Sequence, residues 1–545
     1  MNILYKNKTT LLMACTAALT MSSCNDFLAI TPLNSIVVEN YWEKKSEVEA
    51  VIAACYVDME AANFNKRLIV WGELRGDNVA ETSTLKQNTE LHDFYTNNIT
   101  TTNSWNDWAP LYNVINLCNN VLYYAPQAQE NDGNFSMEEL HSYEAEARCI
   151  RAFCYFQLVR TFQKVPLVLN ASIGDDEDFK VAAASEDSIM AQIIDDLQWA
   201  GQYIWSASYF DDTAQRKGRF NKQSAKALLG DVYLWKGDYQ RCAGLCKEIM
   251  DEKVAEYQSQ LSDMQSGNYN SYMQNGDISL YEGYPLIQGQ TGSHDAYNRI
   301  FIDGNSFESI FEMQYDAENN ISNAGLTMFY GGLTDVGSGQ LNTAAYLTTT
   351  VGELFSDKTD IRLYENTGYD GETAAQSYYI LKYRMSYANT NTGALRTTYP
   401  NWIVYRLTDI MLMRAEALAY LGGETNCQEA FSLVEAVNER ACGGQTKLTY
   451  DQTTIKEQIL EERQRELMFE GKRWYDLVRM VRHSDNPTQA MRTLRNTYLL
   501  RKYDTGGQDA IARMASINNL YLPFYQSEVD VNPLLETDQN PAYKD

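Results

Sequence analysis

The sequence predicts a mainly α-helical protein, in which tetratricopeptide-like helix pairs form a scaffold that carries a loop-rich insertion with short β-strands. Helical periodicity is strong over residues 138–162, 219–242 and 455–482. A pattern similar to that of 219–242 returns at 405–441. The 545 residues exceed what one hydrophobic core usually supports, so we expect two cores or a repeat array.

The N-terminus has the order of a bacterial lipoprotein leader. Lys6 and Lys8 precede an apolar block from about residue 11 to 21, and two serines then lead to Cys24. A charged start, a short apolar middle and small residues before a cut are typical of a secretory signal peptide. The block is too short to span a bilayer, which takes roughly 20 apolar residues.

We therefore expect a signal peptide over 1–23 and a lipidated tether over 24–40. Lipidation of Cys24 with several acyl chains would hold the chain firmly on a membrane. Met21 departs from the Leu that is usual three residues before the cut. The alternative is an ordinary secreted protein with an incidental cysteine.

The stretch 138–162 predicts a single long helix. Three- and four-residue steps place Ala147, Ile150, Cys154 and Leu158 on one face. The helix should end before Val165-Pro166, because a proline disfavours helical backbone at the residue before it.

Two stretches predict pairs of helices joined by tight turns. In 219–242, Gly230 lets the two helices approach, Tyr233 fills the gap and Gly237 lies at the turn. In 405–441 the turn lies at Gly422-Gly423. Two such units predict a helical-repeat scaffold, and their uneven spacing excludes a regular solenoid.

The stretch 455–482 predicts a third helical run that closes the scaffold. Its apolar stripe repeats every seven residues, at Leu460, Leu467, Trp474 and Val481. Enzymes that cleave glycosides use a pair of carboxylates, so the glutamates of this run suggest that function. However, arginines lie between these glutamates at helical spacing. We therefore interpret these groups as ion pairs: Glu461, Glu462, Glu466 and Glu470 with Arg463, Arg465 and Arg473.

Composition narrows the possible ligands. The formal net charge is −27, which argues against nucleic acid because phosphate binding needs clustered Lys and Arg. The ten cysteines include Cys149, Cys154, Cys242 and Cys246 among apolar residues, so core thiols explain them best. With four histidines and no CxxC or HExxH pattern, we expect no metal site and no cofactor; calcium has no EF-hand spacing to support it.

Several blocks of characteristic sequence span nearly the whole chain: CNDFL (24–28), YW (41–42), GELRGDN (72–78), EARCIRAFCYFQLVRTF (146–162), RLTDIMLMRAEA (406–417), ERQRELMFEGKRWYDLVR (462–479) and NPLLETDQNPAY (532–543). Together they resemble the SusD/RagB family, the surface lipoproteins with which Bacteroidetes bacteria capture nutrients. The segment YLPFYQSE (521–528) departs from the family pattern because it lacks the second proline of Pro-x-Pro.

The resemblance implies a SusD-like scaffold that performs no chemistry. We expect an N-terminal helical region over 41–250 with part of the ligand region, and a C-terminal helical region over 401–545. Between them, 251–400 is rich in Gly, Asn, Thr, Ser and Tyr with little periodicity, which predicts the ligand-binding insertion. Such proteins sit as a lid over a TonB-dependent, SusC-like transporter, bind an oligosaccharide or sometimes a peptide, and deliver it. Cys24 would be the tether of that lid at the outer membrane, on its exterior face.

Aromatic and mixed polar side chains are the candidate ligand contacts. Aromatic rings offer flat faces to sugars, and the chain has 38 Tyr and 9 Trp. Trp42, Trp108, Trp235, Trp402 and Trp474 fit core patterns, whereas Trp105 lies in a polar loop. The other candidates are Arg75, Asp77 and Asn78, which also fit a structural turn, and Tyr281, Tyr284 and Tyr297 of the insertion.

Two other classes of function stay open at this point. A surface glycosidase is motivated only by the abundant carboxylates, and Ser293-His294-Asp295 cannot align as a triad because the residues are adjacent. A structural adaptor would use the tetratricopeptide-like helix pairs to bind protein partners.

Overall fold

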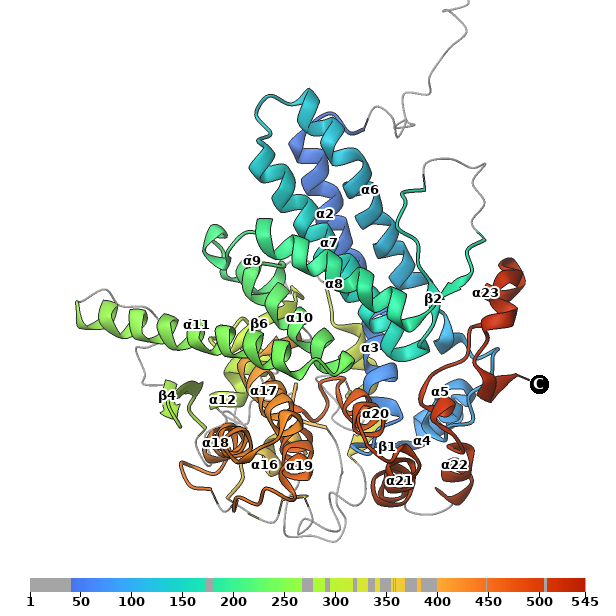
Figure 1. Cartoon of the computed structure of the whole chain (residues 1–545), viewed down its shortest axis with the longest axis vertical. Helices are drawn as coiled ribbons and strands as arrows, with labels where there is room; N and C mark the ends of the chain where they lie inside the picture. Colours follow the sequence, from blue (N-terminus) through green and yellow to red (C-terminus); the bar gives the residue numbers. More distant parts are fainter. Residues whose placement is uncertain are drawn as a thin grey trace, which may run out of the picture.

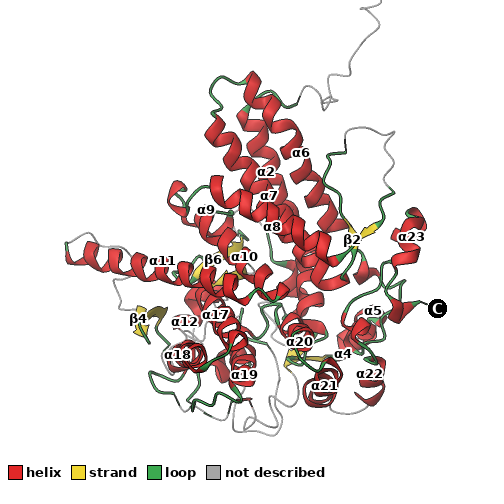
Figure 2. Cartoon of the chain, viewed as in Figure 1, coloured by secondary structure: helices red, strands yellow, loops and turns green. Residues whose placement is uncertain are grey.

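The computed structural model is a helical molecule with a few short strands (Figures 1 and 2). It describes residues 41–172, 180–266, 278–289, 295–316, 321–331, 339–343, 354–355, 357, 359–367, 380–383, 399–446, 448–503 and 507–544. Cys24, the predicted leader and tether, Ser293 and His294 lie outside the described residues. Within the described part of the chain, no helix is long and apolar enough to cross a membrane.

A bundle of four long helices forms the N-terminal part, drawn in blue to green in Figure 1. Its members are α2 (Lys45–Glu60), α6 (Ala109–Asn131), α7 (Met137–Phe162) and α8 (Glu186–Tyr203), and α7 packs against both α6 and α8. The predicted helix over 138–162 is confirmed as α7.

Local chemistry sets both ends of α7. A reciprocal capping box between Ser136 and Glu139 begins it. It ends at Gln163, whose φ of +68° leaves the helical region. Val165–Pro166 then forms strand β2, which pairs with β3 (Ala183–Ala184), so the predicted end of the helix is also confirmed.

The two predicted helix pairs are present. The first is α10 (Lys222–Lys236) and α11 (Tyr239–Gln265), joined at Gly237 with φ +82°. The second is α17 (Leu407–Leu421) and α18 (Glu424–Ala441), joined at Gly422-Gly423. Both turns need positive φ, which glycine adopts without a steric cost. Helices α11 and α17 pack against one another, so the two pairs form one scaffold.

The predicted insertion over 251–400 does contain short strands, but its start differs. Helix α11 continues past residue 250 to Gln265. All strand pairs of the described residues are antiparallel, and two of them tie the insertion to its flanks. The two that tie the insertion to its flanks are β1 (Val79–Glu81) with β7 (Leu341–Thr343), and β6 (Ser309–Met313) with β8 (Trp402–Arg406). The pair β4 (Ile278–Tyr281) with β5 (Tyr284–Ile287) lies within the insertion, and β2 with β3 is described above.

The single helical run predicted over 455–482 is wrong, because it is two helices, α19 (Ile455–Leu467) and α20 (Arg473–Arg482). At the turn between them, Phe469 and Gly471 have φ of +68° and +71°. A tertiary contact fixes this turn: a Cβ on Gly72 would lie 2.0 Å from the Gly471 carbonyl oxygen. All four residues of the predicted apolar stripe are buried, but they lie on two helices.

Shorter elements complete the described chain. They are α3 (Ala62–Ile69), η3 (Val70–Leu74), α4 (Ser83–Gln87), α5 (Thr89–Tyr95), η4 (Ser104–Asn106), η5 (Ala207–Tyr209), α9 (Thr213–Gly218), α12 (Asp295–Tyr297), η6 (Asn298–Asp303), α13 (Ala324–Phe329), α16 (Arg362–Asn366), α21 (Pro487–Thr493), η8 (Leu494–Tyr498), η9 (Leu499–Lys502), α22 (Gly507–Arg513), η10 (Ile517–Leu520), α23 (Gln526–Val531), η11 (Pro533–Asp538) and η12 (Pro541–Tyr543).

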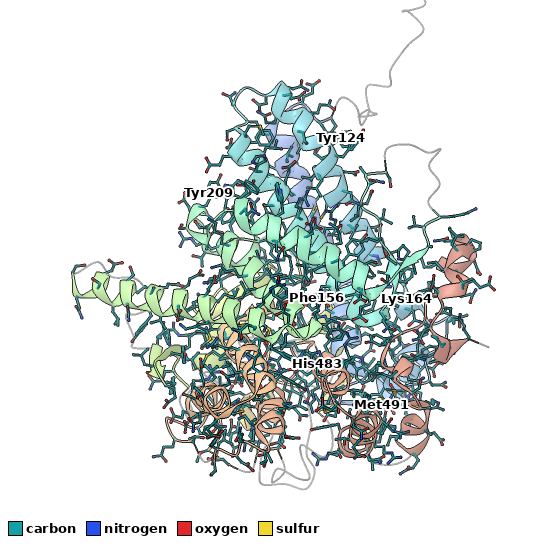
Figure 3. All side chains as sticks on the ribbon, viewed as in Figure 1. Tyr124, Phe156, Lys164, Tyr209, His483 and Met491 are labelled. Carbon is teal, nitrogen blue, oxygen red and sulfur yellow. The ribbon has the colours of Figure 1, made fainter. Side chains whose placement is uncertain are left out.

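The hydrophobic core is continuous through the described residues. All five tryptophans predicted as core are buried, which confirms that prediction. The eight cysteines of the described chain are free and buried, so the prediction of core thiols for Cys149, Cys154, Cys242 and Cys246 is confirmed too. Figure 3 shows Phe156 of α7 among the densely packed side chains at the centre of the molecule.

Candidate ligand-binding surface

Trp105 is the predicted contact that the structure leaves partly exposed on a fixed loop. The loop is the short turn η4, between α5 and α6. Its Asn103 accepts a hydrogen bond from the Trp105 amide (3.0 Å) and donates to the Glu90 carbonyl oxygen (2.9 Å). The Glu90 carboxylate accepts from the amide and the hydroxyl of Ser104 (3.0 and 2.6 Å). The backbone of the loop is therefore held from α5.

Arg67 of α3 holds the same loop from the other side. Its guanidinium donates to the Asp107 carbonyl oxygen (2.6 Å), the Asp107 carboxylate (2.9 Å) and the Asn63 carbonyl oxygen (2.6 Å). Burial lowers the pKa of Arg67, while Asp107 raises it. The Arg67 guanidinium carbon lies 5.9 Å from the centre of the Trp105 ring, within the range of a cation–π contact.

Two aromatic residues complete the support of Trp105. The indole N–H of Trp71 donates to the Trp105 carbonyl oxygen (2.9 Å), and the Phe329 ring lies 6.0 Å from the Trp105 ring. Thr100 and Thr102 beside the loop are exposed. A half-buried indole on a rigid backbone, with small polar neighbours, is suited to stacking on the apolar face of a ligand. We call Trp105 with its supports Arg67, Glu90 and Phe329 the Trp105 platform.

Sequence reasoning identified Trp105 but missed its supports. Arg67, Glu90 and Phe329 come from three separate elements, and no spacing in the sequence links them to residue 105. The cap formed by Asn103 is the one support with a local sequence signal, since Asn is favoured before a short helical turn.

Arg75 lies inside the scaffold. It is 1% exposed and donates to Asn97 Oδ1 (3.0 Å) and to the carbonyl oxygens of Leu520 and Asn519 (3.0 and 2.5 Å). Its guanidinium carbon is 4.1 Å from the centre of the Trp474 ring. The structure corrects the predicted sugar contact. The guanidinium of Arg75 donates its hydrogen bonds to Asn97 and to backbone carbonyl groups of the C-terminal segment, and the side chain does not reach solvent.

Asp77 and Asn78 are also structural. Both carboxylate oxygens of Asp77 accept from Arg473 (2.6 and 3.0 Å). Gln464 donates to Asp77 and to Asn78 Oδ1 (3.2 and 3.0 Å). Asp77 is 1% exposed and Asn78 is fully buried, so the structure corrects their predicted role and supports the simpler reading of a structural turn.

The three tyrosines of the insertion lie apart from the Trp105 platform. Tyr281 and Tyr284 pair across the tip of the β4–β5 hairpin, where Tyr281 is 8% exposed and Tyr284 is half-buried. Tyr297 is buried on α12, and burial raises its pKa well above the usual value. Burial removes Tyr281 and Tyr297 as surface contacts, which leaves Trp105 and Tyr284 as partly exposed candidates.

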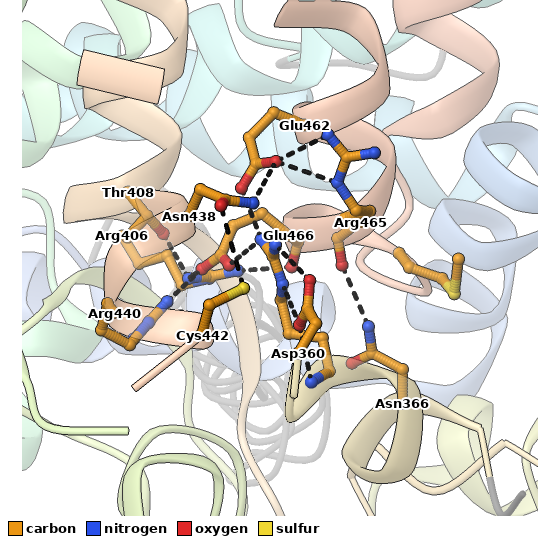
Figure 4. A network of polar contacts seen from close by, with 12 residues as sticks. Asp360, Asn366, Arg406, Thr408, Asn438, Arg440, Cys442, Glu462, Arg465 and Glu466 are labelled. Atoms are coloured by element: carbon orange, nitrogen blue, oxygen red, sulfur yellow. Dashed lines mark hydrogen bonds and ion pairs between the residues drawn. The ribbon is translucent and has the colours of Figure 1, made fainter. Parts of the chain in front are cut away.

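Two carboxylates of α19, Glu462 and Glu466, belong to a buried ionic network (Figure 4). Glu466 pairs with Arg406 (2.6 Å), Arg440 (2.5 Å) and Arg362 (3.1 Å), and Glu462 pairs with Arg362 (2.6 Å). Burial alone would raise the pKa of Glu466, but Arg440, Arg406 and Arg362 lower it well below the usual value. The ion-pair interpretation is confirmed, although most partners come from other elements of the chain.

The scaffold of helix pairs with short antiparallel strands places the chain in a mainly helical fold class. The chain belongs to the SusD family: residues 248–543 match the family model described as "SusD family". Residues 26–234 match a second model, described as "Starch-binding associating with outer membrane". SusD-family proteins are binding proteins.

Known relatives resemble the chain over most of its length. "SusD-like protein P38" of Formosa agariphila is 25% identical over 84% of this chain and 88% of that protein. A "SusD-like protein" of Bacteroides ovatus is 24% identical over 98% of both chains.

Solved structures share the fold. A SusD homolog from Bacteroides thetaiotaomicron has a TM-score of 0.67 and 20% identity, over 92% of this chain and 98% of that one. A structure named "Laminarin binding SusD-like protein" has a TM-score of 0.61 and 23% identity, over 92% of this chain and all of the other. The predicted SusD-like fold is therefore confirmed.

Proposed function

We propose that the chain is a cell-surface lipoprotein that captures oligosaccharides and delivers them to a TonB-dependent, SusC-like transporter of the outer membrane. The observation that carries the proposal is the Trp105 platform within a SusD-family scaffold. The names of the relatives support a glycan as ligand, since one relative is named for laminarin and one family model for starch.

In this proposal Trp105 stacks on the ligand, and Tyr284, which lies apart from the platform, is a separate candidate contact. Stacking needs a ring that does not move when the sugar arrives, because ordering a mobile side chain costs binding energy. The hydrogen bonds at the Trp105 amide and carbonyl fix the backbone, and the contacts of the ring with Arg67 and Phe329 restrict the indole, so part of that cost is met in advance.

Calorimetry with a soluble form that begins at Asn25 tests the ligand class. A panel of neutral oligosaccharides should give binding heat. Trp105→Ala should weaken binding about two- to tenfold, because an aromatic stacking contact is worth on the order of 0.5–1.5 kcal/mol beyond the area it buries. Trp199→Ala is the matched control, since Trp199 is also half-buried but lies on α8. Heat from oligopeptides with none from glycans would show the peptide-capturing version of the function.

The membrane part of the proposal rests on Cys24. Cys24→Ala should release the protein from the outer-membrane fraction and leave its affinity for the ligand unchanged. Retention of the variant in that fraction, or a loss of ligand affinity, would show that Cys24 is not the lipid anchor that we propose. Co-purification of the lipidated protein with a TonB-dependent transporter tests the partner.

A further inference from the structure

A cleft in the C-terminal part of the scaffold is separate from the Trp105 platform. It has a volume of about 370 Å³ and lies between α17, α19, α20, α21 and η8. Ligand pockets commonly have volumes of roughly 300–1,000 Å³, so the cleft can hold a small molecule or one side chain of a larger ligand. Its lining shares no residue with the platform.

One wall of the cleft is a tyrosine ring that is locked in place. The ring of Tyr420 stacks on Tyr239 (centroids 4.8 Å apart, planes 10° apart). His483, labelled in Figure 3, packs its edge against both rings, with centroid distances of 5.5 Å. The ring of Tyr420 is thereby fixed with one face covered.

A cation of the chain itself lies over the ring of Tyr420. The ammonium nitrogen of Lys456 is 4.0 Å from the ring centre. Because Tyr239 covers one face, this ammonium lies at the other. Lys456 is an exposed residue of α19 with a flexible stem, so it can leave this position at little cost. It therefore occupies the place where the ammonium group of a ligand would bind.

The charges around the cleft favour a cationic ligand. Glu416 and Asp476 line it, but both pair with Arg479 (2.6 and 2.8 Å). Glu457 and Asp485 also line it and are exposed, and neither forms an ion pair with another described residue. The ammonium of Lys456 supplies one positive charge in the lining against these two carboxylates, so the cleft keeps a negative potential, which repels an anion and attracts a cation.

We propose that this cleft binds a ligand through a primary ammonium group, which replaces Lys456 at the ring of Tyr420. Glu457 and Asp485 supply the compensating charge, and Met480 and Leu460 contact the uncharged body of the ligand. The ammonium can belong to an amino sugar or to a lysine side chain. The site is independent of the oligosaccharide contact at Trp105.

The test uses the soluble chain from Asn25 at low salt and about pH 6, where amines are protonated and screening is weak. Calorimetry compares a glucosamine trimer with the same trimer in its N-acetylated form, which lacks the charge. The amino form should bind at least about tenfold more tightly. Trilysine is a third probe. If trilysine binds and the glucosamine trimer does not, the ammonium site is supported and its ligand is a peptide.

Variants separate this site from unspecific attraction. Lys456→Gln should tighten binding of the amino probe about two- to fivefold, because it removes the internal competitor at an exposed cation–π contact. Glu457→Gln should weaken binding by a similar factor. Lys86→Gln and Glu130→Gln change exposed charges on α4 and α6 and should have no effect.

Three results would overturn the proposal. They are equal binding of the amino and N-acetylated trimers, weaker binding in Lys456→Gln, and no binding of any ammonium probe. The preference for the amino trimer over its N-acetylated form should persist in Trp105→Ala, so failure here is distinguishable from failure of the oligosaccharide function.

Discussion

Replacing Glu466 by Gln should destabilise the fold by about 3–5 kcal/mol at neutral pH, the usual cost of removing one partner from a buried ion pair. Glu466 is 1% exposed and faces the guanidinium groups of Arg406, Arg440 and Arg362. Gln keeps the shape but presents an NH2 group to these donors, and it leaves three buried positive charges with one anion fewer. Total stabilities are on the order of 5–15 kcal/mol, so this is a large fraction.

The loss should depend on pH. The pKa of Glu466 in the folded state lies well below its usual value of 4.5, because the three arginines outweigh the burial that raises it. The ionised carboxylate therefore contributes stability above about pH 4.5, and this contribution disappears as the pH falls through the lower folded pKa. Gln does not titrate, so the difference between the variant and the natural protein should shrink in acid.

Urea unfolding followed by circular dichroism, at pH 7 and again at about pH 3.5, measures both effects. Glu461→Gln is the matched control, because Glu461 lies on the same helix but is 55% exposed and only 3.8 Å from Arg465. An exposed pair of this kind is worth about 0–1 kcal/mol. Equal losses in the two variants at pH 7, or a difference for Glu466→Gln that grows in acid, would refute the reasoning.

Two further predictions concern the Gly72 contact and the Trp105 platform. Gly72→Ala should lower the free energy of unfolding in urea by about 1–3 kcal/mol, because its Cβ would lie 2.0 Å from the Gly471 carbonyl oxygen, and backbone atoms cannot easily move aside. Gly133→Ala is the control, because a Cβ there meets nothing within 4 Å. An equal effect of the two substitutions would contradict the prediction. Arg67→Met should weaken oligosaccharide binding in calorimetry, because it removes the hydrogen bonds that hold Asp107 at the end of the Trp105 loop. The helical content of the protein should be retained. Unchanged affinity would show that Arg67 does not position Trp105.

Local patterns predicted the helices accurately where local chemistry decides the structure. Helix α7 begins at a capping box and ends before a proline, and both signals are adjacent in the sequence. The turn at Gly237 was also predictable from local sequence, because the turn needs positive φ and glycine is the residue that adopts it readily. The break between α19 and α20 was missed although Gly471 is a local signal for it. The turn also has positive φ at Phe469 and a close approach of Gly72, and neither is visible in the local sequence.

The candidate site was harder to predict for the same physical reason. Arg75, Asp77 and Asn78 are polar residues near a turn, and such residues are usually exposed. Here their partners lie far along the chain, as with Asp77 and Arg473. Trp105 was identified because its immediate neighbours are short and polar, whereas the burial of Tyr281 and Tyr297 depends on elements that fold over them.

The Trp105 platform is positioned by residues of both the N-terminal and the C-terminal helical regions. Trp71, which holds the Trp105 carbonyl oxygen, lies in η3 beside Gly72, and Gly72 is packed against Gly471. The Glu73 carboxylate accepts a hydrogen bond from the Gly471 amide (3.1 Å). The half-buried indole is thus linked through η3 to the turn between α19 and α20. The boundaries predicted at residues 250 and 400 therefore mark changes of composition, and the scaffold that orients the ligand contact is built from residues on both sides of them.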